Sequence, residues 1–170
     1  MDKPKLPEPW LRGTLADVQP VQRAVLHALE LAKEDLQQWC GDLSDDQLNA
    51  RPGDIAPVAF HIRHIARSCD RLLTYADGAQ LSSEQIAAMK GEISPGATRA
   101  ELFAELSVAF DHSAERIRAF LPGDFDQART IGKKQMPATL GGILVHVADH
   151  TQRHTGQAIT TAKFVRLPKK

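Results

Sequence analysis

The sequence has few aromatic residues, no excess of either charge and no long apolar run. Phe, Trp and Tyr make up only 5% of the 170 residues, which disfavours a β-sandwich and favours helices rich in Ala and Leu. Lys plus Arg and Asp plus Glu are equal at 21 each, so no global positive field would recruit nucleic acid or an anionic membrane. We therefore expect no nucleic-acid partner.

Apolar stretches and cysteines are equally scarce. No segment approaches the roughly 20 apolar residues that cross a bilayer, and the first ten residues, MDKPKLPEPW, lack the apolar core of a signal peptide. We expect a cytoplasmic protein with no membrane partner. Cys40 and Cys69 are the only cysteines, and because the cytosol keeps thiols reduced, we expect both to be free thiols in the core.

The length and the prolines suggest how the chain is divided. Residues 1–13 contain Pro4, Pro7 and Pro9, which predict an extended N-terminal arm on the surface or against a partner. The remaining residues, 14–170, are long enough for one domain with a proper core. We therefore predict an arm and a single domain.

Apolar residues recur at steps of three and four in four segments, as in amphipathic helices. Gly41 ends the first helix, Thr98 and Glu101 form a capping box for the third, and Thr139 is a plausible N-cap for the fourth. The predicted helices span about residues 17–39, 57–76, 98–121 and 139–163. Four such helices and no run of strand period predict an all-α four-helix bundle.

The connections between these helices have room for shorter ones. Ser44 can cap one short turn before Pro52, and the segment SSEQIAAMK at 82–90 has room for one short helix before the ISPGAT breaker. We therefore expect short connecting helices beside the four long ones.

Five of the seven histidines fall in two clusters inside predicted helices: HIRH at 61–64 and the nine residues from His146 to His154. His146, His150 and His154 follow a four-residue spacing that places them on one helix face. Neighbours on that face can share a metal ion, but residues eight apart lie about 12 Å apart along the axis and cannot. The pair is therefore His146 with His150 or His150 with His154.

A third ligand must come from another helix, and His61 and His64 are the available candidates. Three histidines leave coordination positions open for a water, a thiol or a carbonyl, as in catalytic sites. An isolated HxxxH pair is weak support, because solvent-facing or hydrogen-bonded histidines are common. We interpret His27 and His112 as such ordinary residues. Cys69 follows His64 by five residues, a poor spacing for sharing its metal.

The segments HIRHIARSCDRLLTY at 61–75 and GGILVHVADHTQRHTGQAIT at 141–160 resemble the DinB-like superfamily of DNA-damage-inducible, YfiT-type proteins. The most specific part is HxxxHxGQ, here His150 to Gln157, together with His64 and the small apolar residues that follow it. The resemblance covers almost the whole chain. It implies an up-down-down-up four-helix bundle, often a homodimer.

The same resemblance implies a divalent metal ion, zinc or nickel, held by one histidine of the second long helix and two of the last. Carried over, the ligands are His64, His150 and His154. His61 and His146 depart from this minimal pattern and are candidates for acid or base groups in the pocket, or for groups that orient ligands.

Characterised members of the superfamily include transferases and isomerases that use a low-molecular-weight thiol, which the metal is proposed to activate as thiolate. The resemblance therefore implies a metal-dependent enzyme acting on a small-molecule substrate. We expect a thiol-dependent S-transferase, with a hydrolase that uses metal-bound water as a neighbouring alternative. The rival from another class is a non-catalytic metal-binding or stress-response protein, and an interaction module with incidental histidines is a third alternative.

Overall fold

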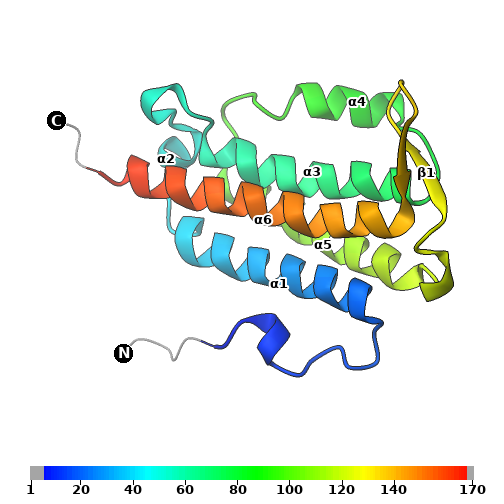
Figure 1. The fold of residues 1–170 in the computed structure, drawn as a ribbon. Helices are drawn as coiled ribbons and strands as arrows, with labels where there is room; N and C mark the ends of the chain where they lie inside the picture. The colour runs from blue at the N-terminus through cyan, green and yellow to red at the C-terminus, as the bar shows by residue number, and fades with distance from the viewer. Residues whose placement is uncertain (1–5, 168–170) are drawn as a thin grey trace.

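The structure, a computed structural model, describes residues 6–167 and is mostly helical. Four long helices lie side by side, with the C-terminal one, α6, between α1 and α3 in the view of Figure 1. Their bounds are α1 Pro20–Cys40, α3 Val58–Ala76, α5 Arg99–Ala119 and α6 Leu140–Val165. The predicted all-helical class is therefore confirmed, and each of the four predicted segments overlaps one of these helices over most of its length.

Contacts between helices give their directions. His61, near the start of α3, contacts His154 of α6, whereas Ser68, two turns later, contacts His150, which comes earlier in α6. These two helices are therefore antiparallel. Figure 1 shows that α1 runs in the same direction as α6, and that α3 and α5 run in the opposite direction.

The core forms where the apolar faces of these helices meet. Burial of its apolar face stabilises a helix far more than the intrinsic helix propensity of its residues does. The predicted stripes of the first two long helices are largely confirmed, and the last helix contributes an apolar face of its own. The buried residues include Val25, Leu29, Ala32 and Leu36 of α1, Ile62, Ile65, Cys69 and Leu73 of α3, and Leu144, Val147, Ala158 and Ala162 of α6.

Local capping signals position several helix starts as predicted. Thr98 accepts a hydrogen bond from the backbone N–H of Glu101, whose carboxylate accepts one from the N–H of Thr98. Thr139 caps α6 by accepting from the N–H of Gly142. Such caps satisfy backbone donors that would otherwise lack a partner at the first turn. Gly41 is the C-cap of α1, also as predicted.

Two short α-helices occupy the connections. α2, Asp45–Asn49, begins with a capping box at Ser44, and α4, Ser83–Lys90, begins with one at Ser82. No residue of α4 is fully buried, and in Figure 1 this helix lies along the outer side of α3. The expected short connecting helices are therefore present.

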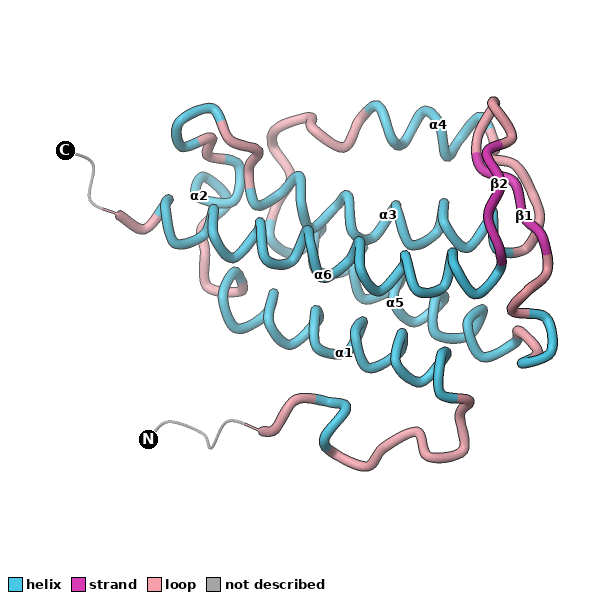
Figure 2. The backbone as a smooth tube through the Cα atoms, viewed as in Figure 1, coloured by secondary structure: helices cyan, strands magenta, loops and turns pink. Residues whose placement is uncertain are grey.

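A β-hairpin between α5 and α6 was not expected from the sequence. β1, Ala128–Ile131, pairs antiparallel with β2, Met136–Thr139, and Figure 2 shows both strands in magenta beside the ends of the long helices. Each strand has four residues, and they are joined by a turn in which Gly132 and Gln135 have positive φ. The strands bury too little apolar surface to leave a period of two in the sequence.

The end of α5 also differs from the prediction. The third helix was predicted to run to about residue 121, but it ends at Ala119, and Leu121 is 67% exposed. Gln22 of α1 explains this end, because its buried side-chain amide donates to the carbonyls of Ile117 and Phe120. One carbonyl in the last turn of α5 and that of its C-cap residue are thereby satisfied from another helix.

The described part of the predicted N-terminal arm, residues 6–13, is not wholly extended, because Pro9–Leu11 form a 3₁₀ turn. Arg12 then pairs with Glu30 and Glu34 of α1, which holds this segment beside the bundle. Residues 1–5 of the predicted arm lie outside the described residues. Within the described chain, no helix is both long and apolar enough to cross a membrane.

Candidate metal centre

Three of the sequence-predicted histidines converge between α3 and α6. His64 comes from the middle of α3, and His150 and His154 lie one turn apart on α6. Each offers one ring nitrogen to a group in which all these nitrogens lie within 4.8 Å of one another. The three side chains are partly buried. The antiparallel pairing of α3 with α6 therefore brings together residues 86 positions apart in the sequence.

The spacing of the nitrogens suits metal ligation. Nε2 of His64 lies 3.3 Å from Nε2 of His150. Two nitrogens each 2.0–2.1 Å from one tetrahedral zinc ion lie about 3.3 Å from each other. The ring centroid of His154 lies 4.3 Å from that of His64 and 4.6 Å from that of His150. All three rings thus face one small volume.

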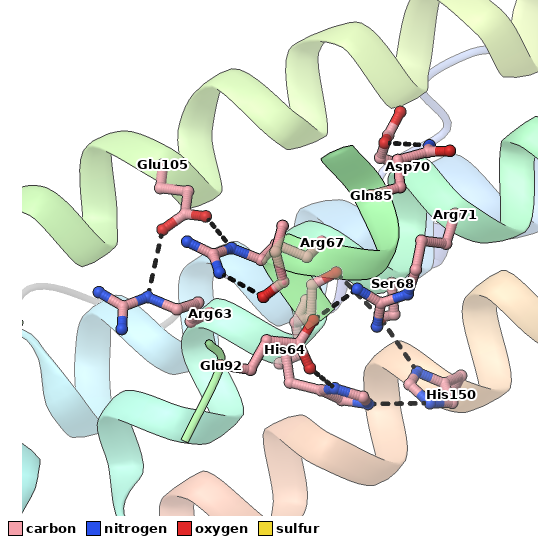
Figure 3. Close-up of polar contacts among 12 residues, drawn as sticks. Arg63, His64, Arg67, Ser68, Asp70, Arg71, Gln85, Glu92, Glu105 and His150 are labelled. Atoms are coloured by element: carbon pink, nitrogen blue, oxygen red, sulfur yellow. Dashed lines mark hydrogen bonds and ion pairs between the residues drawn. The ribbon is translucent and has the colours of Figure 1, made fainter. Parts of the chain in front are cut away.

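The second ring nitrogen of His64 is held by a carboxylate. Its Nδ1 lies 2.6 Å from Oε2 of Glu92, while Oε1 of Glu92 accepts from Arg71 at 2.5 Å. Figure 3 shows this chain from Arg71 through Glu92 to His64. A carboxylate bound to the far nitrogen fixes the tautomer and ring orientation of a metal-ligating histidine. His64 is therefore prepared to ligate through Nε2.

Glu92 is ionised although it is almost wholly buried. Its side chain is only 4% exposed, and burial by itself raises the pKa of a carboxyl group. The hydrogen bonds from His64 and Arg71 outweigh burial, so that the pKa of Glu92 lies below its ordinary value. The buried charge is thus paired on both oxygens, as a carboxylate in this environment requires.

His150 is oriented in a similar way by Ser68 of α3. Oγ of Ser68 lies 3.3 Å from Nδ1 of His150, and the same hydroxyl donates its proton to the carbonyl of Ile65. The Ser68 oxygen is then left to accept from Nδ1–H of His150. This arrangement places the proton on Nδ1 and leaves Nε2 of His150 for the metal.

His154 completes the pattern with a histidine as its partner. Nδ1 of His154 lies 3.1 Å from Nδ1 of His61. When His154 ligates through Nε2, its proton lies on Nδ1 and donates to His61. Phe60 stacks on His64 with ring centroids 5.2 Å apart and meets His61 and His154 edge-on, which closes one side of the group with an apolar ring.

The environment keeps the imidazoles of His61, His150 and His154 neutral. Burial is the largest cause that lowers the pKa values of His61, His150 and His154, and neighbouring histidines lower them further, each to about 4. At neutral pH the rings therefore retain the lone pairs that a metal ion needs. A divalent cation fits this donor set, because the ring nitrogens that His150 and His154 offer it carry no proton that it must displace at neutral pH.

The remaining histidines lie outside the group. His146 is 45% exposed and contacts Asp149 on the surface of α6, although its ring centroid is 5.4 Å from that of His150. His61 contacts His154 from outside the trio. His27 is buried and bonded to Thr14, whereas His112 is exposed. Of the two candidates on α3, the structure thus places His64 in the group and His61 beside it.

The two cysteines take no part in the group. Both are buried free thiols, as expected. Sγ of Cys69 lies 3.6 Å from the hydroxyl of Thr151, and burial raises the pKa of the Cys69 thiol to about 11 and that of Cys40 to about 12. A thiol that stays protonated at neutral pH is a poor metal ligand.

The sequence analysis missed the groups that support the ligands. Ser68 and Arg71 follow His64 by four and seven residues, so a polar stripe at helical spacing was a usable signal. Glu92 lies in the connection between α4 and α5, and no local pattern distinguishes it from an exposed loop residue. Its role depends on the fold that brings it to His64.

Comparison with known protein families identifies the family of this chain. The sequence profile of the DinB superfamily matches residues 28–158, which include all three histidines. The chain belongs to the DinB superfamily. The resemblance inferred from the two histidine segments is thereby confirmed. As a DinB-superfamily protein it was expected to be helical and to carry a metal site of this kind, and the structure contains a histidine group that can hold an ion.

One solved structure shows the same fold. It is described as a conserved protein from Enterococcus faecalis, and it aligns with a TM-score of 0.72 over 87% of this chain and 98% of that one. The two sequences are 16% identical, so the likeness of this DinB-superfamily member to it concerns the fold alone. No curated protein matches the chain.

Proposed function

We propose that this DinB-superfamily chain is a divalent-metal-dependent enzyme, a thiol-dependent S-transferase that acts on a small-molecule substrate. His64, His150 and His154 would hold the ion, zinc or nickel. The observation that carries the proposal is the convergence of three imidazoles whose Nδ1 atoms are each held by another group. Such an arrangement is built for ligation through Nε2.

The number of ligands favours a catalytic ion over a structural one. Within residues 6–167, no further His, Cys, Asp or Glu joins the group, and both oxygens of Glu92 already have partners. Three protein ligands leave room for a water or a substrate group, whereas structural sites are usually closed by a fourth. When bound, a divalent ion there supplies Lewis acidity, which lowers the pKa of a coordinated thiol or water.

The chain's own residues would position the ion and orient its ligands. Glu92, Ser68 and His61 hold the rings of the three ligands in one orientation, and Phe60 excludes water from one side. We assign His61 mainly to the orientation of His154, since its Nδ1 is engaged there. His146 lies at the exposed edge, and we retain it as a candidate acid or base group.

Several further features belong to the same proposal. We propose that the four long helices form the up-down-down-up bundle typical of the superfamily, that residues 14–170 are one domain, and that the protein is a cytoplasmic homodimer using a low-molecular-weight thiol. Hydrolysis by metal-bound water uses the same open site and stays a neighbouring alternative. The rival is a non-catalytic metal-binding or stress-response protein.

Metal analysis followed by a thiol-transfer screen tests the proposal. The purified protein should contain close to one zinc or nickel ion per chain. The His150→Ala variant should contain none, because that change removes one of the three proposed ligands. His146→Ala is the matched control on the same helix and should retain the metal. The loaded protein should then transfer a low-molecular-weight thiol to an electrophile, and the His150→Ala protein should not. Unchanged metal content in His150→Ala contradicts the site, while bound metal without any turnover favours the non-catalytic rival.

A further inference from the structure

A groove of about 660 Å³ lies beside the histidine group. One wall comes from Ile55, Ala56 and His61, and the other from Arg153, Gly156 and Gln157 of α6. The volume is within the range of small-molecule sites, roughly 300–1,000 Å³. Because His61 lines the groove and contacts His154, the groove adjoins the proposed metal centre.

The residues on the α6 wall share one helix face. Arg153, Gly156, Gln157 and Thr160 follow the spacing i, i+3, i+4, i+7, and all four line the groove. Gln157 lies three residues after His154, so the same helix presents a metal ligand and the groove. This face is left open by the fold, since all four residues are exposed.

Gly156 has no packing reason to be glycine. It lies inside α6, where glycine is a poorer helix former than alanine. A Cβ at this position would meet no atom within 4 Å, so the close approach of another part of the chain does not require the missing side chain. The absence of a side chain leaves the helix backbone accessible from the groove. This feature favours a ligand that lies directly against α6.

The polar groups of the groove indicate the kind of ligand. Arg153 is 54% exposed, and among the residues described here only Asp149 accepts a hydrogen bond from its guanidinium, through Nη2 at 2.9 Å. Such an exposed ion pair contributes little to stability, so a ligand carboxylate can replace Asp149 as the partner of Arg153. The side chain of Gln157 is exposed and makes no hydrogen bond within the described chain. The lining residues include no carboxylate, so the groove offers one positive charge and a free amide.

We propose that this groove binds the carboxylate-bearing end of the thiol substrate, with Arg153 as its anchor. A planar guanidinium pairs well with a carboxylate, and a single cation matches a monocarboxylate better than a dianionic phosphate. Gln157 hydrogen-bonds an amide or hydroxyl next to that carboxylate, and Gly156 lets the ligand lie on the helix. The inference rests on the proposed function, because it takes the reacting thiol to lie at the metal.

Two small thiols that differ in a carboxylate test this inference. N-acetylcysteine and N-acetylcysteamine share the thiol and the acetamide, but only the first carries a carboxylate. The full chain loaded with cobalt(II) reports thiolate coordination through a near-ultraviolet charge-transfer band, so each dissociation constant can be measured. We expect N-acetylcysteine to bind at least fivefold more tightly. Equal dissociation constants for the two thiols overturn the inference.

Variants assign the preference to the groove. Arg153→Gln should weaken N-acetylcysteine at least fivefold and leave N-acetylcysteamine within twofold. Arg118→Gln, which changes an exposed arginine of α5, is the matched control and should preserve the preference. Gly156→Ala should raise the melting temperature because alanine favours the helix, yet weaken N-acetylcysteine binding several-fold. A preference that survives Arg153→Gln contradicts the role of Arg153.

Failure of the thiol chemistry can be separated from failure of the groove. If neither thiol produces the charge-transfer band, the proposed thiol-dependent function is wrong. N-acetylalanine, which has the carboxylate but no thiol, then tests the groove alone by NMR titration of the backbone amides. Shifts at Gly156 and Gln157 that disappear in Arg153→Gln support a carboxylate site. No shift at either amide overturns it.

Discussion

Glu92 lies against His64, with its Oε2 atom 2.6 Å from Nδ1 of the histidine and its other oxygen bonded to Arg71. This contact joins the connection between α4 and α5 to the middle of α3. It also means that one candidate metal ligand is oriented by a residue 28 positions away in the sequence. The orientation of His64 in the proposed metal site therefore depends on how the connection between α4 and α5 packs against α3.

The first prediction concerns this carboxylate. Glu92→Gln removes the charge that holds His64 in one tautomer, and the loss of such a partner lowers metal affinity by roughly 10- to 100-fold. Competition with a chromophoric chelator measures the zinc dissociation constant. Glu115→Gln changes an exposed carboxylate of α5 and should leave the constant unaltered. Equal affinities of the two variants would show that Glu92 does not support the site.

The second prediction concerns pH and the metal-free protein. The pKa values of His61, His150 and His154 are about 4 in the folded chain, against about 6.5 when unfolded. As the pH falls from 6.5 to 4, the unfolded chain takes up protons before the folded chain does. The free energy of unfolding should therefore be highest above pH 6.5 and decrease through this window.

Urea unfolding at several pH values measures this dependence. The His150→Gln variant should show a shallower slope, by about one proton, because it removes one of the titrating groups. Added zinc should stabilise the protein more at pH 7.5 than at pH 5, since the ligands must be neutral to bind it. A free energy of unfolding that is flat between pH 7 and pH 4 would contradict the cause assigned here.

The third prediction concerns the cysteines. Cys40 and Cys69 are buried, and burial raises their thiol pKa values to about 12 and 11. Neither thiol should react with Ellman's reagent at pH 8 in the native protein, and both should react in guanidinium chloride. The Cys69→Ser variant should also keep its metal content, because the thiol lies outside the histidine group. Rapid labelling of either native thiol would show that it is not packed as described.

The fourth prediction concerns the end of α5. Gln22 is 3% exposed and donates to the carbonyls of Ile117 and Phe120. Gln22→Leu leaves both carbonyls without this donor and should lower the free energy of unfolding by about 1–3 kcal/mol. Gln38→Leu alters an exposed glutamine of the same helix and should change the free energy of unfolding by less than about 0.5 kcal/mol. Urea denaturation compares the two, and equal effects would remove the role given to Gln22.

Much of the helical framework follows from local patterns. The apolar spacing from Val25 to Leu36 and the capping boxes at Ser44 and Thr98 act within a few residues, so they can be read without a fold. The hairpin at 128–139 could not be read in this way, because its strands are short and only partly buried. The early end of α5 was missed because Gln22, which caps it, belongs to another helix.

For the candidate site, too, some features follow from local sequence and others from tertiary packing. The sequence by itself determined that His150 and His154 share a helix face, because four residues make about one turn, and the family resemblance pointed to His64. Only the tertiary structure decided that His64 rather than His61 joins them, and that Glu92, Ser68 and His61 hold the outer nitrogens. Helical spacing is a local property of the chain, whereas the pairing of α3 with α6 depends on packing between residues far apart in sequence.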